Sequence, residues 1–205
     1  NIVGGSLTPR GSSKRGVNFE LLVSGAVSIS GLRVSTESGN ALNFDGDVSG
    51  TITVSDSHFR SGHYTGFACR NAASLNGMTL SFTGGSIESA LSHSINIQST
   101  GDAATTMSFT DVVVTAPSFD CMYFFVAFAG SVSVAGGTMS CPVGNGVVFA
   151  QPVSGAVSIG GTIRAPAAGM FGVTFEAAVT ADVTITADVA SDLTAVNFAS
   201  TLTSG

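Results

Sequence analysis

A short segment of alternating small and apolar residues recurs along the whole chain at almost constant intervals. Its clearest copy spans residues 25–31, and the copies begin at Gly25, Gly50, Met78, Thr105, Gly130, Gly155 and Ala181. The intervals between these starts are 25, 28, 27, 25, 25 and 26 residues. A fixed period of this size is typical of solenoids, in which each repeat forms one rung and stacks on its neighbours. We therefore expect residues 1–205 to form a single β-solenoid segment.

Within each copy, apolar residues alternate with small polar ones, which is the pattern of a half-buried strand. Four apolar columns follow from aligning the copies. The first contains Val27, Ile52, Leu80, Met107, Val132, Val157 and Val183, the second Ile29, Val54, Phe82, Phe109, Val134, Ile159 and Ile185, the third Val34, Phe59, Ile87, Val114, Met139 and Val189, and the fourth Phe19, Phe44, Cys69, Ile97, Phe124, Phe149, Phe175 and Phe198. The sequence predicts an all-β fold, a right-handed parallel β-helix of about eight rungs with three short strands per rung.

A fifth column predicts a bend that is repeated in the rungs. It contains Gly4, Gly31, Asp56, Gly84, Asp111, Gly136 and Gly161. Glycine and aspartate are the residues that tolerate a positive φ at a turn. A protruding turn is expected at residues 8–16, and long insertions are expected at residues 58–64, 71–77 and 98–104.

Charge and cysteine content narrow the classes of function. Charged residues make up 10% of the chain, against about 25% in ordinary domains. Beyond Arg70 the sequence contains one basic residue, Arg164, and eight acidic residues, and this balance argues against a surface that binds nucleic acid. No uninterrupted apolar run is long enough to predict a membrane span. The three cysteines have no metal-binding spacing, so no cofactor or metal is expected.

The cysteines also raise the question of a disulfide. Cys121 and Cys141 fall on successive rungs but at different offsets, which leaves a disulfide between them open. Cys69 replaces phenylalanine in an apolar column and is interpreted as a small core residue.

The columns resemble those of the right-handed parallel β-helix superfamily, which includes pectin-lyase-like enzymes, phage tailspikes and repetitive surface adhesins. The Val-Ser-Gly-x-Val-Ser-Ile rhythm with phenylalanine-rich rung ends, in residues 22–29 and 152–159, also resembles the very long dispersed-family surface proteins of trypanosomatid parasites. The resemblance implies a fold, and it does not imply an activity.

Two charged groups are weighed as enzymatic sites. Asp56, His58, Arg60, His63 and Arg70 would supply an acid, a base and an anion holder, but Asp56 belongs to the bend column and we interpret the histidines as loop residues. Glu20, Asp45 and Arg70 share one outward column, and paired carboxylates can hydrolyse glycosides. The Asn-Thr-Asp, Asp-Asp, Gly-His-Gly and Arg-x-Lys motifs of β-helix hydrolases are absent from the sequence. A charge ladder in which Arg70 relieves the repulsion between the two carboxylates is therefore favoured.

Two rows of small hydroxyl residues are expected on the outward side of the first strand. The candidate interaction residues are Ser28, Thr51, Thr53, Thr79, Ser81, Thr106, Ser108, Ser131, Ser133, Ser158 and Thr184, with Ala26, Ala156 and Asp182 interrupting the rows. Three hypotheses fit such a face: packing against a protein partner or a neighbouring solenoid, binding to ice, or a ladder that only covers the surface.

The favoured function is a non-enzymatic structural or adhesive segment of an extracellular or surface solenoid, acting as a shaft, spacer or filament component. Its expected partners are other solenoid segments or an assembly, with glycans as a further candidate. The alternative is a β-helix that binds or cleaves polysaccharides. Since Ile2 enters at the fifth position of a rung and residues 202–205 match residues 23–25, we expect an excerpt of a longer solenoid that associates end to end when isolated.

Overall fold

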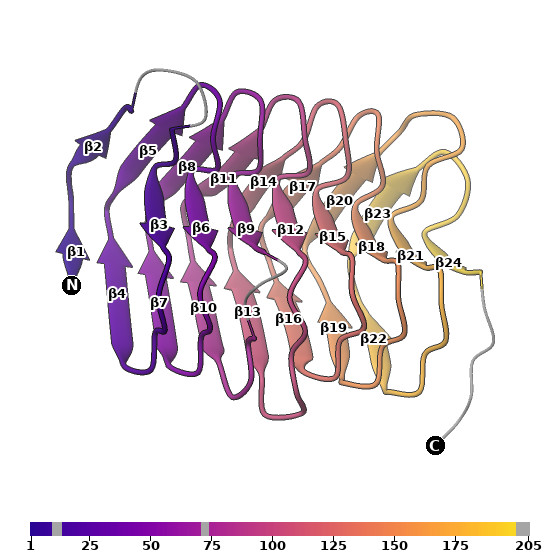
Figure 1. The fold of residues 1–205 in the computed structure, drawn as a ribbon. Coiled ribbons are helices and arrows are strands. Elements are labelled where there is room, and N and C mark those ends of the chain that lie inside the picture. The colour runs from indigo at the N-terminus through magenta and orange to yellow at the C-terminus, as the bar shows by residue number, and fades with distance from the viewer. Residues whose placement is uncertain (10–13, 71–73, 200–205) are drawn as a thin grey trace.

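The chain winds into a β-solenoid built from three parallel sheets. The computed structural model describes residues 1–9, 14–70 and 74–199, and this part contains strands and turns but no helix (Figure 1). Each rung contributes one strand to each sheet, and β1 (Ile2–Val3) and β22 (Val183–Ile185) lie at opposite ends of the first sheet (Figure 1). Part of the predicted turn at residues 8–16, part of the predicted insertion at residues 71–77 and the match at residues 202–205 lie outside the described residues.

The three sheets each contain eight strands in spatial order. Sheet 1 consists of β1 (Ile2–Val3), β4 (Ala26–Ser30), β7 (Thr51–Ser55), β10 (Thr79–Thr83), β13 (Thr106–Thr110), β16 (Ser131–Ala135), β19 (Val157–Ile159) and β22 (Val183–Ile185). Sheet 2 consists of β2 (Ser6–Leu7), β5 (Arg33–Thr36), β8 (His58–Ser61), β11 (Ser86–Ser89), β14 (Val113–Thr115), β17 (Thr138–Ser140), β20 (Thr162–Ala165) and β23 (Asp188–Ser191). Sheet 3 consists of β3 (Val17–Phe19), β6 (Leu42–Phe44), β9 (Phe67–Cys69), β12 (Ile95–Ile97), β15 (Met122–Phe124), β18 (Val147–Phe149), β21 (Val173–Phe175) and β24 (Val196–Phe198).

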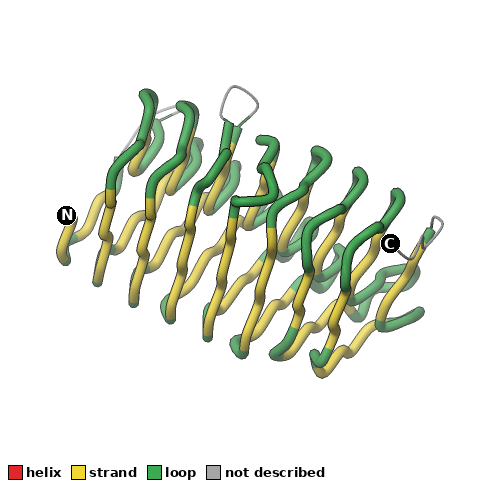
Figure 2. The backbone as a smooth tube through the Cα atoms, turned by 90° about the horizontal axis from the view of Figure 1, so that it is seen from below, coloured by secondary structure: helices red, strands yellow, loops and turns green. Residues whose placement is uncertain are grey.

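The predicted register is confirmed in all three sheets. Each strand pairs in parallel with the strand one rung away, so that Val27 lies opposite Ile52, Val34 opposite Phe59, and Phe19 opposite Phe44. Figure 2 shows the resulting rows of strands, with the connecting loops at the corners of the rungs. Ile163, which pairs with Met139 and with Val189, completes the third column that the sequence left with a gap.

Phenylalanine rings stack along the axis in the fourth column. The ring centroids of Phe124 and Phe149 lie 4.6 Å apart, those of Phe149 and Phe175 lie 4.9 Å apart, and the two rings of each pair are nearly parallel. Parallel stacking of identical rungs places identical side chains above one another, and offset stacking of aromatic rings is favourable. Cys69 and Ile97 interrupt the ring stack, and both are fully buried.

An additional inward column was not predicted from the sequence. Outside the strands, single backbone bridges pair Val23 with Val48 of the next rung and Gly101 with Phe128 of the next rung. The column that contains Phe128 continues in the same way through the later rungs. A Cβ atom on Gly101 would lie 2.7 Å from the Phe128 ring, so the absence of a side chain in one rung makes room for the large ring in the next. The core is therefore fitted between rungs as well as within them.

The predicted bend is confirmed at every position of its column. Asp56 and Asp111 have φ angles of 47° and 54°, and the glycines of the column also have positive φ. The bend after β19 is one residue shorter than the bend after β16: Ile159 pairs with Val134 and Thr162 with Thr138, so Gly161 lies against both Gly136 and Gly137.

Two predicted insertions differ from the structure. Residues 58–61 form β8, which pairs in register with β5 and β11, so the interpretation of this segment as a loop was wrong. Gly101 pairs with Phe128, so the insertion at residues 98–104 is confined to the turn after Gly101. In this turn Asp102 Oδ1 accepts hydrogen bonds from the Gly77 and Ala104 amides and from Thr105 Oγ1. The Gly77 amide is the largest of the contributions that lower the pKa of Asp102.

The cysteines take two different structural roles. Cys121, next to β15, and Cys141, directly after β17, form a disulfide with a Cα–Cα distance of 5.7 Å. Their unequal offsets place them on opposite sides of the corner between sheets 2 and 3, in successive rungs. Cys69 is a free thiol, and its complete burial raises its pKa. Its interpretation as a core residue is confirmed.

Candidate binding surfaces

The predicted hydroxyl residues all lie on the outward side of sheet 1, in two rows that follow the solenoid axis. Thr51 pairs with Thr79 and Thr53 with Ser81, and the same register continues through β13 and β16. The structure adds a third row that the sequence reasoning missed. It contains Ser30, Ser55, Thr83 and Thr110 and ends at Ala135. The third row is the fifth position of the same alternating pattern, so the period-two signal already contained it.

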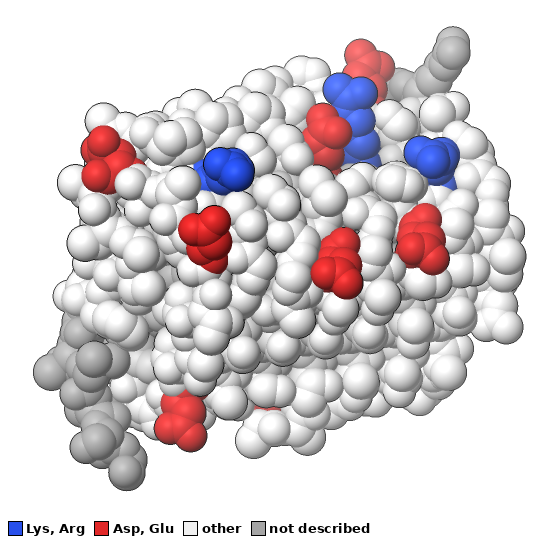
Figure 3. Space-filling model, turned by 180° about the vertical axis from the view of Figure 1, so that it is seen from behind, with Lys and Arg blue, Asp and Glu red and all other residues white. Residues whose placement is uncertain are grey.

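This hydroxyl face carries no charged side chain within the strands of sheet 1. The exposed hydroxyl residues of this face include Thr51, Thr53, Thr79 and Ser158, and the hydroxyl residues of β13 and β16, which lie between β10 and β19, are half-buried. In the view from behind, most basic and acidic side chains lie in the upper half, and the lower part of the surface is mostly white, with acidic atoms at its lower left and lower edge (Figure 3). A flat, neutral surface with short side chains can approach another flat surface closely without desolvating charges.

The outward column of Glu20, Asp45 and Arg70 is present at the end of sheet 3, but its predicted charge pairing was wrong. Asp45 forms its ion pair with Arg15, which precedes β3, and not with Arg70. Glu20 Oε1 accepts a hydrogen bond of 2.8 Å from Asn18 Nδ2. Among the described residues, Arg70 has no ion pair with a carboxylate. Its guanidinium group is therefore available to an external anion or hydroxyl group.

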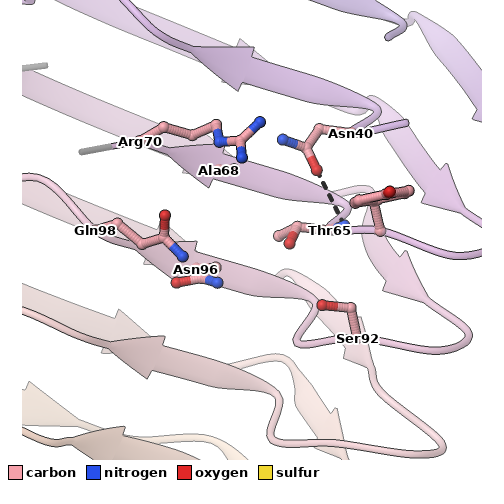
Figure 4. A pocket seen from close by; sticks show the side chains of 8 residues that line it. Asn40, Thr65, Ala68, Arg70, Ser92, Asn96 and Gln98 are labelled. Atoms are coloured by element: carbon pink, nitrogen blue, oxygen red, sulfur yellow. Dashed lines mark hydrogen bonds between the residues drawn. The ribbon is translucent and has the colours of Figure 1, made fainter. Parts of the chain in front are cut away.

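Arg70 borders a polar hollow on the outer face of sheet 3, with a volume of about 170 Å³. The hollow is lined by Asn40, Tyr64, Thr65, Ala68, Arg70, Ser92, Asn96 and Gln98 (Figure 4). Ala68 stands between Asn43 and Asn96 in the outward row of this sheet, and its short side chain leaves the space open.

The amide groups around the hollow are only partly satisfied within the protein. Asn40 Oδ1 accepts a hydrogen bond of 3.2 Å from the Thr65 amide (Figure 4), and Asn40 Nδ2 donates one to Asn43 Oδ1. Asn96 Oδ1 is buried and has no hydrogen-bond partner in the described part of the chain. A buried carbonyl oxygen without a partner costs free energy, so a donor that enters the hollow would be favoured.

An aromatic cluster adjoins this hollow on the next rung. Tyr123 lies opposite Asn96 in the sheet, and the His93 ring stacks on Tyr123 with centroids 4.5 Å apart. Phe119 and Phe125 extend the cluster toward solvent, with exposed fractions of 46% and 54%. Desolvation, followed by the negative charges of Glu176 and Asp120, raises the pKa of Tyr123. Exposed rings next to amide groups are suited to contact the apolar faces and the hydroxyls of a sugar.

His93 is the second polar side chain of this surface with an unfulfilled hydrogen bond. Its Nδ1 atom lies 3.2 Å from Asp120 Oδ2, a distance that permits an ion pair, but the angles do not meet hydrogen-bond geometry. Asp120 is already held by the amide and the side chain of Asn145. Asn145 of the next rung therefore fixes the position of the Asp120 carboxylate beside the aromatic cluster.

The other charged group considered from the sequence is divided between two sheets. His58 and Arg60 point outward on β8 of sheet 2, Asp56 occupies the bend before it, and Arg70 directly follows β9 of sheet 3. The structure therefore does not assemble these side chains into one site. Within residues 1–9, 14–70 and 74–199, no group of three or more His, Cys, Asp or Glu side chains is arranged to hold a metal ion.

Comparisons with known proteins add no relative to this description. No protein-family model matches the chain, and no curated protein or solved structure matches it. The part of the chain that the structure describes contains no helix capable of crossing a membrane. The parallel β-solenoid is therefore established by its geometry alone.

Proposed function

We propose that the chain is a non-enzymatic segment of an extracellular or surface-displayed solenoid, in which it acts as a rigid shaft that carries adhesive surfaces. The observation that carries this proposal is the in-register pairing of three sheets along the whole described solenoid. Bending such a rod would require hydrogen bonds to lengthen in at least one sheet while the stacked rings of the core separate. Three sheets around one core therefore resist bending in every direction.

The surface chemistry and the disulfide support this proposal. A shaft needs a surface that packs against neighbours, and the neutral hydroxyl face of sheet 1 is suited to that role. The disulfide between Cys121 and Cys141 supports an extracellular location, since disulfides persist mainly in oxidising compartments. The ion pair of Asp45 with Arg15 supports a structural role for the carboxylate column of sheet 3.

A glycan panel tests the non-enzymatic part of the proposal. The protein is incubated with neutral and acidic polysaccharides, and the products are separated by chromatography. We expect no cleavage by the native protein, and no change in glycan binding in Glu20→Gln or Asp45→Asn. Cleavage that is lost in either variant, with the circular dichroism spectrum retained, would make the chain an enzyme and overturn the proposal.

The packing role of sheet 1 is tested by placing a charge on its face. Thr53→Lys introduces an ammonium group in the middle of the hydroxyl rows, and Thr138→Lys introduces one on the outer face of sheet 2 as a matched control. If the hydroxyl face contacts a neighbouring solenoid, Thr53→Lys weakens concentration-dependent association in analytical ultracentrifugation and Thr138→Lys does not. Equal association of both variants would rule out this face as the contact.

Glycan binding on sheet 3 is the second candidate function, favoured by the polar hollow beside the aromatic cluster. The chain contains two tyrosines and no tryptophan, and both tyrosines, Tyr64 and Tyr123, lie at this surface. Tyrosine fluorescence therefore reports ligand binding there without background from elsewhere. We expect oligosaccharides to change this fluorescence, and Phe125→Ala to weaken the binding by at least about fivefold. Leu21→Ala, at another exposed apolar residue, is the control, and unchanged binding in Phe125→Ala would refute this candidate.

A further inference from the structure

A second hollow lies on the outer face of sheet 2, away from the surface formed by sheet 3. It has a volume of about 290 Å³ and is formed by strands β2, β5, β8 and β11. Its polar lining includes Arg33, Ser35, His58, Arg60, Ser86 and Glu88. Neither the hydroxyl face nor the aromatic cluster contributes to it.

The register of the sheet brings the basic side chains together. Arg33 on β5 lies directly opposite His58 on β8, and Arg60 lies two residues beyond His58 on the same side of the strand. Neighbouring strands are about 4.8 Å apart, so the three basic groups share one small area. Basic side chains opposite one another in a sheet gain nothing from this arrangement unless an anion lies between them.

The internal partners of these groups leave most of their binding capacity free. Arg60 Nε lies 3.1 Å from Glu88 Oε1, but the side chains are 62% and 36% exposed, and an ion pair of this kind contributes little. Among the described residues, Arg33 has no carboxylate partner. The Nδ1 atom of His58 shares a hydrogen bond of 2.8 Å with Ser86 Oγ, which leaves its Nε2 atom unpartnered by that contact.

The charge of the hollow is opposite to that of the whole chain. Arg33 and Arg60 contribute two positive charges and Glu88 one negative charge, which leaves a formal charge of +1 before any proton on His58. The chain as a whole has a net charge of −6. Figure 3 shows basic side chains near one another in the upper right, toward the N-terminal end, with acidic side chains beside them and a mostly white surface around them. A local positive field on an acidic molecule is an arrangement that concentrates anions at one place.

We propose that this hollow binds a tetrahedral oxyanion ester carried by a sugar, that is, a sulfate or phosphate monoester. The guanidinium groups and the hydroxyls of Ser35 and Ser86 are donors, and Glu88 is the single carboxylate of the lining. Guanidinium groups bind such oxyanions through paired hydrogen bonds, and a tetrahedral anion can accept bonds from several directions at once. The volume of the hollow fits one charged group and the sugar ring attached to it. This site is independent of the shaft role and of the glycan surface on sheet 3.

Isothermal titration of the whole chain tests the proposal with matched ligands. A sulfated dextran oligosaccharide, unsulfated dextran of the same length and glucose 6-phosphate are titrated at low and at physiological salt. We expect unsulfated dextran not to bind at this site, and at least one of the two esters to bind with an affinity that falls as salt increases. Binding of the sulfated sugar or of the phosphorylated one identifies the source of the oxyanion.

Three variants separate a built site from general attraction to basic residues. Arg33→Gln should weaken ester binding by about fivefold or more, because it removes the guanidinium group without an internal partner. Glu88→Gln should strengthen binding by about threefold, because it removes the competing carboxylate and frees Arg60. Arg164→Gln is the matched control, since Arg164 lies in the same outward column as Arg60 at a later rung.

The outcomes distinguish this site from the others on the molecule. Ester binding should leave the tyrosine fluorescence unchanged, because neither tyrosine lines this hollow. Absence of ester binding, an equal loss of affinity in Arg33→Gln and Arg164→Gln, or a tyrosine signal that follows ester binding would each overturn the proposal.

Discussion

The stacked phenylalanines make Phe149→Ala the most informative single substitution in the core. The Phe149 ring is fully buried, and it lies between the Phe124 and Phe175 rings at centroid distances of 4.6 and 4.9 Å. Replacing a buried phenylalanine with alanine costs about 3–5 kcal/mol of unfolding free energy. Each lost ring pair adds about 0.5–1.5 kcal/mol. We therefore expect a loss at the upper end of the range, about 4–5 kcal/mol.

The position of the ring explains why the loss should not be relieved by collapse. Backbone hydrogen bonds of β18 to β15 and to β21 hold the neighbouring rungs at a fixed spacing, so the rungs cannot close around the space that the ring leaves. Phe149→Leu keeps part of the volume and loses the ring stacking, and it should cost about 1–2 kcal/mol. Phe125→Ala, the same substitution at a ring that is 54% exposed, should cost less than about 1 kcal/mol.

Urea unfolding followed by far-ultraviolet circular dichroism measures these differences. With a slope of about 2 kcal/mol per molar urea, a loss of 4 kcal/mol would lower the midpoint by about 2 M at constant slope. The order of cost should be Phe149→Ala, then Phe149→Leu, then Phe125→Ala. If Phe125→Ala and Phe149→Ala lowered the midpoint equally, the assignment of inward and outward columns would be refuted.

Three further predictions concern the cysteines and the bend. Joint replacement of Cys121 and Cys141 by alanine should cost about 3 kcal/mol in the same urea assay, because the disulfide closes a 20-residue separation; unchanged stability would mean that the bond contributes nothing to the fold. Burial raises the pKa of the Cys69 thiol above its ordinary value of 9.0, so iodoacetamide should label this thiol only after unfolding, and rapid labelling of the native protein would contradict its burial. The free energy of unfolding should also decline as the pH rises past 9.0, because the thiol then ionises in the unfolded protein and not in the folded one. Asp56→Ala should cost about 1 kcal/mol in thermal unfolding and Asp56→Gly should be neutral or stabilising, because φ is 47° at this bend; a reversed order would contradict the bend.

The inward columns and the bend could be predicted because they depend on two local regularities. Alternation fixes which side chains point inward, and the constant period fixes which residues stack. The bend could be predicted because its column contains only glycine and aspartate, which tolerate a positive φ. Residues 58–61 were interpreted as an insertion because long polar side chains, those of His58 and Arg60, stand on both sides of Phe59. The segment nevertheless has the ordinary outward, inward, outward alternation of a strand.

The surfaces could be predicted only in part, because they depend on how loops of neighbouring rungs approach one another. The hydroxyl rows follow from the strand pattern, and two of the three were predicted. The hollow on sheet 3 combines Asn40, Tyr64 and Asn96 from neighbouring rungs, and it is open because Ala68 is small. The pairing of Asp45 with Arg15 depends on the segment before β3, and no sequence period predicts where that segment lies.

Distances between spin labels along one outward row test the rigid, in-register solenoid most directly. Ser28 is joined to Thr184 by six successive pairings, through Thr53, Ser81, Ser108, Ser133 and Ser158. At about 4.8 Å per rung the separation is about 29 Å between these positions, and about 24 Å between Thr53 and Thr184.

Nitroxide labels at Ser28→Cys with Thr184→Cys, and at Thr53→Cys with Thr184→Cys, can be measured by double electron–electron resonance. Cys69 is buried and the other two cysteines are joined, so the native thiols should not be labelled in the folded protein. We predict two narrow distributions whose centres differ by about 5 Å, one rung spacing. Broad distributions, or centres that do not differ by one rung, would contradict a rigid solenoid with this register.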